Sequence, residues 1–185
     1  MAQNFQTHKE KMYNQIQEQY GKLLYTYTCN MKQAALLEKE SKKFKWAQII
    51  LSAISAGGFF ATAITDQTQL AWIGGILSTA LLAVNAYLKN KDYAAEEKSH
   101  IDAALKLWPL REEYISLLTD FEELDDTEIV QRRDDLMLRT SEIYKTAPQT
   151  DERAYSEAQN ALKNKEEQFF NQEELNVMLP AHLRR

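Results

Sequence analysis

The chain has 185 residues, enough for one compact domain or for a membrane hairpin with a modest soluble part. Its 22 Lys and Arg against 27 Asp and Glu give a formal net charge of -5, which argues against a nucleic-acid-binding protein because such a protein needs a concentrated positive surface. A single cysteine excludes an intramolecular disulfide and fits a reducing compartment, while five glycines, three prolines and no alternating β-type segment predict an all-α fold.

Residues 1–45 are predicted to form an N-terminal helical region. Apolar side chains recur at steps of three and four from Tyr13 to Ala34, a spacing that places them on one face of a helix and favours packing against partner helices. No clear stop signal precedes Trp46, so this helix is expected to run on into the hydrophobic stretch that follows.

Two uncharged hydrophobic stretches follow, at residues 46–64 and 70–88. A helix of about 19 residues, rising ~1.5 Å per residue, spans the ~30 Å hydrocarbon layer of a bilayer. The polar residues between them, Thr65–Gln69, are just enough for a turn. The sequence therefore predicts a two-span transmembrane helical hairpin over residues 46–88.

The residues that flank the two stretches orient the hairpin. Lysines gather before the first stretch and directly after the second, whereas the turn has no Lys or Arg. Because basic residues near membrane ends mark the cytoplasmic side, residues 1–45 and 89–185 are expected in the cytoplasm, with the turn outside. Aromatic residues are typical interfacial anchors, so the predicted membrane-interface residues are Lys42, Lys43, Lys45, Trp46, Trp72, Tyr87, Lys89 and Lys91.

Residues 89–185 are predicted to form a C-terminal cytoplasmic helical region. Two short apolar stripes follow one another, the first through Ile101, Leu105 and Trp108 and the second through Tyr114, Leu117, Phe121 and Leu124. Because each cytoplasmic helix carries a single stripe, these helices are expected to form a bundle by packing on one another, on the N-terminal helix, or on other copies of the protein.

Helix caps are predicted at two points in this region. Asp125, with Glu128 three residues later, is a candidate N-cap in a capping-box arrangement. Either Thr150 or Asp151 is expected to cap a last helix. Its apolar positions would be Ala154, Ala158, Leu162 and Phe169.

The sequence indicates no enzyme. His8, His100 and His182 are scattered, and none has metal-ligand spacing to another His, Cys or carboxylate. No recognised metalloprotease, serine-hydrolase or phosphate-loop motif occurs. We therefore expect no catalytic residue, no cofactor and no metal site, and interpret the acidic clusters as solvated helix faces and caps.

Small residues recur every fourth position within both hydrophobic stretches. Such ladders let helix backbones approach closely in lipid, where packing rather than hydrophobicity drives association. They would join either the two helices of one hairpin or neighbouring hairpins. The candidate helix-packing residues are Ala53, Gly57, Ala61, Ala71, Gly75 and Thr79.

Polar residues share faces of the same helices. Uncompensated polar groups are costly in hydrocarbon, so the amides of Gln48 and Asn85 should face protein or water. One alternative is that headgroup water satisfies both, since they lie near the inner boundary. The other is that several hairpins assemble as a homo-oligomer around a water-filled path. The candidate pore-lining residues are Gln48, Ser52, Ser55, Thr62, Ser78 and Asn85.

Three segments carry a resemblance to a known family: LLEKESKKFKWAQIILSAISAG, WPLREEYISLLTDF and LMLRTSEIYKTAPQTDERAYSEA. From about residue 15 to about residue 170, the chain resembles the SLATT family of two-transmembrane effector domains from bacterial nucleotide-signalling defence. The resemblance implies an anti-phage effector that permeabilises the bacterial inner membrane in abortive infection. It also implies a cGAS-like nucleotidyltransferase, a SLOG-type sensor or a reverse transcriptase as partner, and control by a nucleotide second messenger.

Two rival functions stay open at this point. The hairpin would serve either as a non-pore membrane scaffold that anchors a cytoplasmic defence partner, or as part of a soluble-to-inserted α-helical pore-forming toxin subunit. The family supplies no catalytic motif to transfer. The cytoplasmic helices leave no room for a separate sensor domain, so the trigger is expected to bind the helical bundle or to act through a partner protein.

Overall fold

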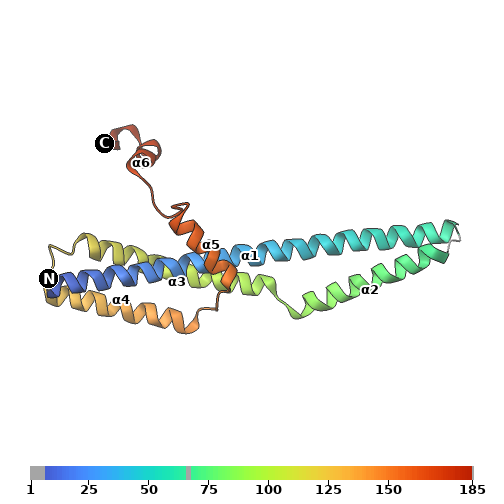
Figure 1. Ribbon diagram of the computed structural model, residues 1–185, viewed down its shortest axis with the longest axis horizontal. Helices are drawn as coiled ribbons and strands as arrows, with labels where there is room; N and C mark the ends of the chain where they lie inside the picture. The colour runs from blue at the N-terminus through green and yellow to red at the C-terminus, as the bar shows by residue number, and fades with distance from the viewer. Residues whose placement is uncertain (1–6, 66–67, 185) are drawn as a thin grey trace, which may run out of the picture. The chain divides into compact units, whose positions relative to one another are not determined.

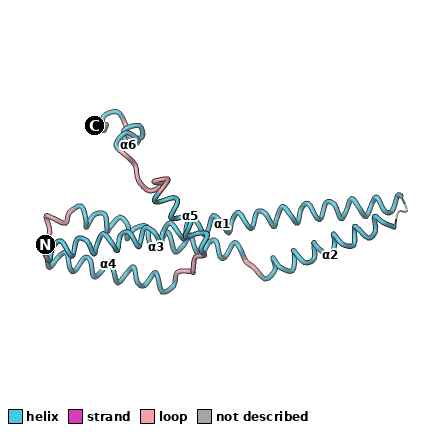
Figure 2. Tube along the Cα trace, in the orientation of Figure 1, coloured by secondary structure: helices cyan, strands magenta, loops and turns pink. Residues whose placement is uncertain are grey.

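The structure, a computed structural model, describes the backbone of residues 7–65 and 68–184 and the side chains of residues 7–57, 69 and 72–184. These residues contain helices and loops and no strand (Figure 2), so the all-α prediction is confirmed for them. In chain order the helices are α1 (His8–Thr65), α2 (Thr68–Asn90), α3 (Tyr93–Thr119), α4 (Asp126–Thr146), α5 (Glu152–Lys163), α6 (Gln172–Met178) and the 3-10 helix η1 (Ala181–Leu183) (Figure 1).

The chain divides into two compact units. The first consists of Met1–Gln33 and Ile101–Arg185, and the second of Ala34–His100. The predicted hairpin at residues 46–88 lies within the second unit, which is longer than the hairpin at both ends. Helix α1 continues without a break from the first unit into the second, as expected from the absence of a stop signal before Trp46.

The first unit is a helical bundle with a single apolar core. Burying a large apolar side chain stabilises the folded state by roughly 1.5–3 kcal/mol, so ten such side chains are a sufficient reason for α1, α3 and α4 to pack together. Tyr13 and Phe121 add an edge-to-face ring contact with centroids 5.0 Å apart. The core residues are Met12, Ile16, Leu23, Leu107, Leu110, Tyr114, Leu117, Phe121, Ile129 and Leu136.

The face of α3 that enters this core agrees with the prediction in the second half of the helix and differs from it in the first. The predicted stripe through Tyr114, Leu117 and Phe121 is buried. Leu105 is 61% exposed and Trp108 is 41% exposed, so the stripe predicted through Ile101, Leu105 and Trp108 was wrong. Two apolar faces of this helix satisfy the helical period equally over a short window. The buried face is the one that continues through Tyr114 to the end of the helix, and its residues are Ala104, Leu107, Leu110, Tyr114 and Leu117.

The two predicted N-caps are present. The Asp125 carboxylate accepts a hydrogen bond from the Glu128 backbone N–H at 2.9 Å. Asp151, rather than Thr150, caps α5 and accepts from the Ala154 N–H at 2.8 Å. Both bonds satisfy one of the backbone donors that a helix leaves free in its first turn.

The chain after α5 departs from expectation. Helix α5 ends at Lys163, so Phe169 lies beyond it, and the side chains that α5 buries are Ala154, Ala158 and Ala161. Glu166 has a φ of 52°, a left-handed conformation that a continuing α-helix does not contain. The sequence analysis missed α6, although Asn171 and Glu174 form a capping box that is a recognisable helix-start signal.

Candidate functional site

The second unit contains the hydrophobic hairpin. Within it, α1 and α2 lie side by side and run in opposite directions (Figure 1). The ring centroids of Phe44 and Tyr87 are 5.2 Å apart, and Gln48 is hydrogen-bonded to Asn85. The residues at which the hairpin begins on α1 therefore face those at which it ends on α2. Residues 66 and 67 of the predicted turn Thr65–Gln69 lie outside the described residues.

Both helices expose large apolar side chains. Trp72, for example, is 73% exposed. Soluble monomers rarely expose contiguous apolar patches larger than a few hundred Å², so a surface of this kind fits lipid or other protein surfaces rather than water. The exposed side chains are Trp46, Ile49, Ile50, Ile54, Trp72, Ile73, Ile76 and Leu82.

One helical segment among the described residues is long and apolar enough to cross a membrane. It lies within Trp72–Thr119, a stretch that includes most of α2 and all of α3, and its most apolar 18-residue window has a mean hydropathy of 1.2 and is not buried within the protein. The second predicted span, at residues 70–88, overlaps this segment. The first predicted span ends in residues 58–64, whose side chains lie outside the described part of the chain.

Two of the predicted pore-lining residues are brought together. The side-chain amide of Gln48 on α1 donates a hydrogen bond to Oδ1 of Asn85 on α2. Hydrogen bonds between polar side chains of membrane helices contribute about 0.6–2 kcal/mol to helix association. Each amide therefore faces protein within the hairpin, one of the two surroundings expected from the sequence, and its partner is the other amide.

The other predicted pore-lining residues lie along the same helices. Ser52 and Ser78 are exposed. Ser55 is half-buried, and its hydroxyl oxygen is enclosed without a hydrogen-bond partner among the described residues. The Thr62 side chain lies outside the described residues. Ser55 thus carries an unsatisfied polar group on an apolar helix, and a nearby donor or a water would satisfy it.

The predicted helix-packing residues make no close helix contact within the chain where they are described. A Cβ placed on Gly57 or Gly75 would meet no described heavy atom within 4 Å. Ala53 is exposed, and the Thr79 hydroxyl donates to the Gly75 carbonyl of its own helix at 2.9 Å. The side chains of Ala61 and Ala71 lie outside the described residues. The described small residues therefore leave open helix faces.

The predicted interface lysines lie on α1 just before residue 46 and on α2 just after residue 88. Lys43, Lys45 and Lys89 are exposed. Lys42 forms an ion pair with Glu38 one turn earlier, with Nζ and Oε1 2.6 Å apart, and this carboxylate raises the pKa of Lys42. All four positive charges are therefore available to water or lipid headgroups.

An aromatic cluster closes this end of the hairpin, and the sequence analysis named only one of its members. Phe44 lies against both Tyr87 and Tyr93, whose hydroxyl oxygens are 3.3 Å apart. The Lys91 ammonium lies 4.9 Å from the centre of the Tyr93 ring and 3.9 Å from a Glu96 oxygen. Burial raises the pKa of Tyr93. Phe44 and Tyr93 were missed, although each lies within two residues of a flanking lysine at a span end.

Among the residues that the structure describes, no cluster of three or more His, Cys, Asp or Glu side chains has the geometry to hold a metal ion. His100 is buried, whereas His8 and His182 are exposed. The three histidines are on α1, α3 and η1.

Comparison with known proteins adds the family. No curated protein and no solved structure matches the chain. A family model does match, over residues 12–174, which include the N-terminal helix, the hairpin and the bundle up to α6. Its members are two-transmembrane effector domains of defence systems that are associated with SMODS and SLOG domains. The chain therefore belongs to the SMODS and SLOG-associating 2TM effector domain family 4, SLATT_4, and is a membrane-associated effector domain.

Proposed function

We propose that this chain oligomerises in the bacterial inner membrane, with both termini in the cytoplasm, and forms or gates a pore that disrupts membrane integrity on infection. Helices α1 and α2 supply the spanning segments. The bundle receives the trigger, either directly or from a partner such as a nucleotidyltransferase or a SLOG-type sensor.

The observation that carries this proposal is the set of polar groups on otherwise apolar helices. Gln48 and Asn85 form one amide pair, and Ser55 holds a hydroxyl without a partner among the described residues. The amide pair can also hold the hairpin together, but a polar group left unsatisfied in hydrocarbon costs several kcal/mol, so a passive anchor has no reason to carry the Ser55 hydroxyl. A helix that faces water in one of its states can satisfy such a group there.

Assembly of several copies is required by geometry. Two helices cannot enclose a water-filled path, whereas a ring of hairpins can. The open faces at Gly57 and Gly75 support close approach of a neighbouring helix, because no described atom of the same chain occupies them. The exposed side chains of α1 and α2 complete a surface that suits lipid on one side and a neighbouring copy on the other.

The exposure of the hairpin also separates this proposal from a toxin subunit stored in water. A soluble storage form hides its hydrophobic hairpin inside the protein, whereas the apolar window of Trp72–Thr119 has no buried residue. An integral protein resists extraction by alkaline carbonate from the moment of its synthesis. Recovery of newly made chain in the soluble fraction would support the stored toxin instead.

The test is the membrane potential of bacteria that express the chain with its full set of defence partners. A potential-sensitive dye should report depolarisation after infection. Ser55→Leu should insert normally and fail to depolarise, whereas Ile54→Leu, an apolar exchange at the neighbouring exposed position, should behave as wild type. Preserved potential in triggered wild-type cells would refute the pore. Full activity with an unrelated hairpin of equal length would support the scaffold function.

A further inference from the structure

One face of the hairpin collects its polar side chains. The hydrogen bond between Gln48 and Asn85 joins α1 to α2, and because Gln48 is half-buried and Asn85 is exposed, the bond lies along an edge of the helix pair. Residues four or seven positions apart share a helix face, so Ser52 lies on this edge of α1 and Ser78 on this edge of α2. The four residues therefore lie on one face of the hairpin, which we call the polar face.

The polar face continues into two lysines. Lys45 precedes Gln48 by three residues, and Lys89 follows Asn85 by four, so each lysine shares a helix face with its amide. Because α1 and α2 run in opposite directions (Figure 1), both lysines lie one turn beyond the amide pair at the same end of the hairpin. Both side chains are exposed. The polar face thus ends in two ammonium groups from each copy of the chain.

The charges of these two lysines are not neutralised within the part of the chain that the structure describes. Lys42 and Lys91 each pair with a glutamate, whereas Lys45 and Lys89 form no ion pair with a described residue. At the other end of the hairpin, residues 65–69 contain no Lys or Arg. Positive charge on the polar face is therefore confined to one end of it.

The opposite face of α1 is apolar and carries a lysine of its own. Ile50 and Ile54 are 52% and 49% exposed. Lys43 lies seven residues before Ile50 and shares its face, whereas it is five residues from Gln48, roughly 140° around the helix. The general preference for lysine at the cytoplasmic end of a span accounts for all the flanking lysines, but not for a polar strip that ends in two of them.

An assembly of hairpins gives this arrangement a consequence. In a ring of copies the polar face suits the water-filled path, and the apolar face suits lipid. Each copy then places two ammonium groups at the cytoplasmic end of the path. Rings of lysine or arginine favour anions in pores. In water at low salt, a unit charge about 4–8 Å from a passing ion changes the local concentration of that ion roughly two- to sixfold.

We propose that the pore conducts small anions in preference to cations, and that Lys45 and Lys89 set this preference. The inference rests on the proposed pore and specifies which ions pass through it. The two lysines act by their charge at the mouth of the path, so the size of the preference follows from how many ammonium groups face the passing ion.

The test is the reversal potential of the current in membrane patches excised from giant spheroplasts. The cells express the chain with its full set of defence partners and are infected before the spheroplasts are made. Patches from infected cells that lack the chain supply the background current. Under a steep gradient of potassium chloride, the reversal potential should lie on the side of the chloride equilibrium potential. The chloride permeability should exceed the potassium permeability by at least about fourfold, roughly twofold for each lysine.

Variants of the lysines separate the polar face from the apolar face. Lys45→Gln and Lys89→Gln should each lower the chloride-to-potassium permeability ratio by at least about twofold. Lys43→Gln, which removes the same charge at the same end of α1, should keep the wild-type ratio, as should Lys89→Arg, which keeps the charge. A potassium preference of the wild-type current overturns the inference and leaves the pore intact, as does an equal effect of all three glutamine variants. Absence of an infection-induced current refutes the pore itself, and this inference with it.

Discussion

Replacing Asn85 by Leu leaves the Gln48 amide without the partner that it has across the hairpin. An unpaired polar group costs about 1–3 kcal/mol when buried, but Gln48 is only half-buried and lies close to the interface, so the lower end of this range applies. We expect Asn85→Leu and Gln48→Leu each to destabilise the hairpin by about 1 kcal/mol. The double variant should lose less than the sum, because neither amide is then left alone.

The assay is a double-mutant cycle in mixed micelles, with unfolding by sodium dodecyl sulfate followed through tryptophan fluorescence. Trp46 and Trp72 report on the hairpin, and a Trp108→Phe background removes the third tryptophan, which lies in the bundle. The expected coupling is about 0.6–2 kcal/mol. Ser78→Leu combined with Gln48→Leu is the matched control and should be additive. A coupling below about 0.3 kcal/mol for the amide pair would show that the contact does not hold the hairpin together.

Three further predictions concern the bundle. In chemical denaturation, Leu107→Ala should lower the free energy of unfolding by about 2–5 kcal/mol. Leu105→Ala, on the exposed face of the same helix, should change it by no more than about 0.5 kcal/mol. Similar effects of the two substitutions would reverse the assignment of the buried face. Asp125→Ala should lower the free energy of unfolding by about 1 kcal/mol through loss of the α4 cap. Asp126→Ala, at the next position, should lower it by less. Equal shifts of the thermal unfolding midpoint would exclude a capping role for Asp125. Burial raises the pKa of Tyr25 to about 12, above its ordinary value of 10. The contribution of the neutral phenol to the free energy of unfolding is therefore complete below pH 10 and is lost as the pH rises through 12. A Tyr25→Phe variant whose free energy of unfolding falls with alkaline pH as that of wild type does would contradict this.

Local signals predicted most of the fold. The continuity of α1, the caps at Asp125 and Asp151, and the position of the hairpin each depend on residues close together in sequence. The stripe through Tyr114 and Leu117 was predicted, but the buried face in the first half of α3 was missed because two apolar faces fit the helical period there, and only packing against α1 and α4 decides between them. The short helix α6 was missed although its capping box was visible in the sequence.

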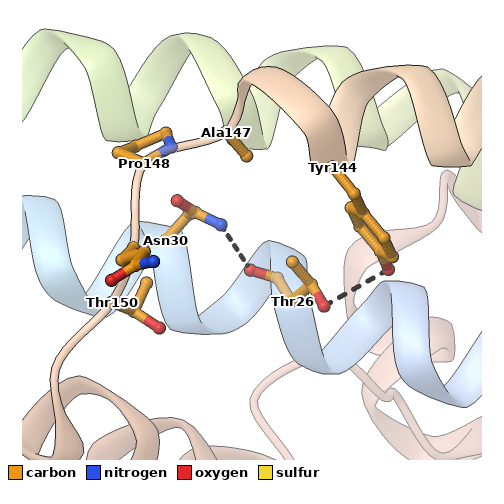
Figure 3. Close-up of a pocket in the computed structure, with 7 residues that line it drawn as sticks. Thr26, Asn30, Tyr144, Ala147, Pro148 and Thr150 are labelled. Atoms are coloured by element: carbon orange, nitrogen blue, oxygen red, sulfur yellow. Dashed lines mark hydrogen bonds between the residues drawn. The ribbon is translucent and has the colours of Figure 1, made fainter.

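The candidate site was predictable in its residue types but not in its pairings. Composition alone identifies Gln48 and Asn85 as unusual in an apolar stretch, but their hydrogen bond depends on the register of α1 against α2. The cluster of Phe44 and Tyr93 was invisible for the same reason, since these residues are far apart in sequence. A pocket beneath the segment between α4 and α5 brings Thr26 and Asn30 together with Tyr144 (Figure 3), residues more than 100 positions apart that no sequence period connects.

The exposed hairpin side chains also affect how a cell makes this protein. A chain that presents Trp72, Ile76 and Leu82 to its surroundings aggregates if it waits in water, so translation and insertion must be closely timed. In the proposed topology the segment Thr65–Gln69 crosses the bilayer, and it carries a single charge, Asp66, so its passage requires little work. The two helices of the proposed hairpin can therefore enter the lipid together.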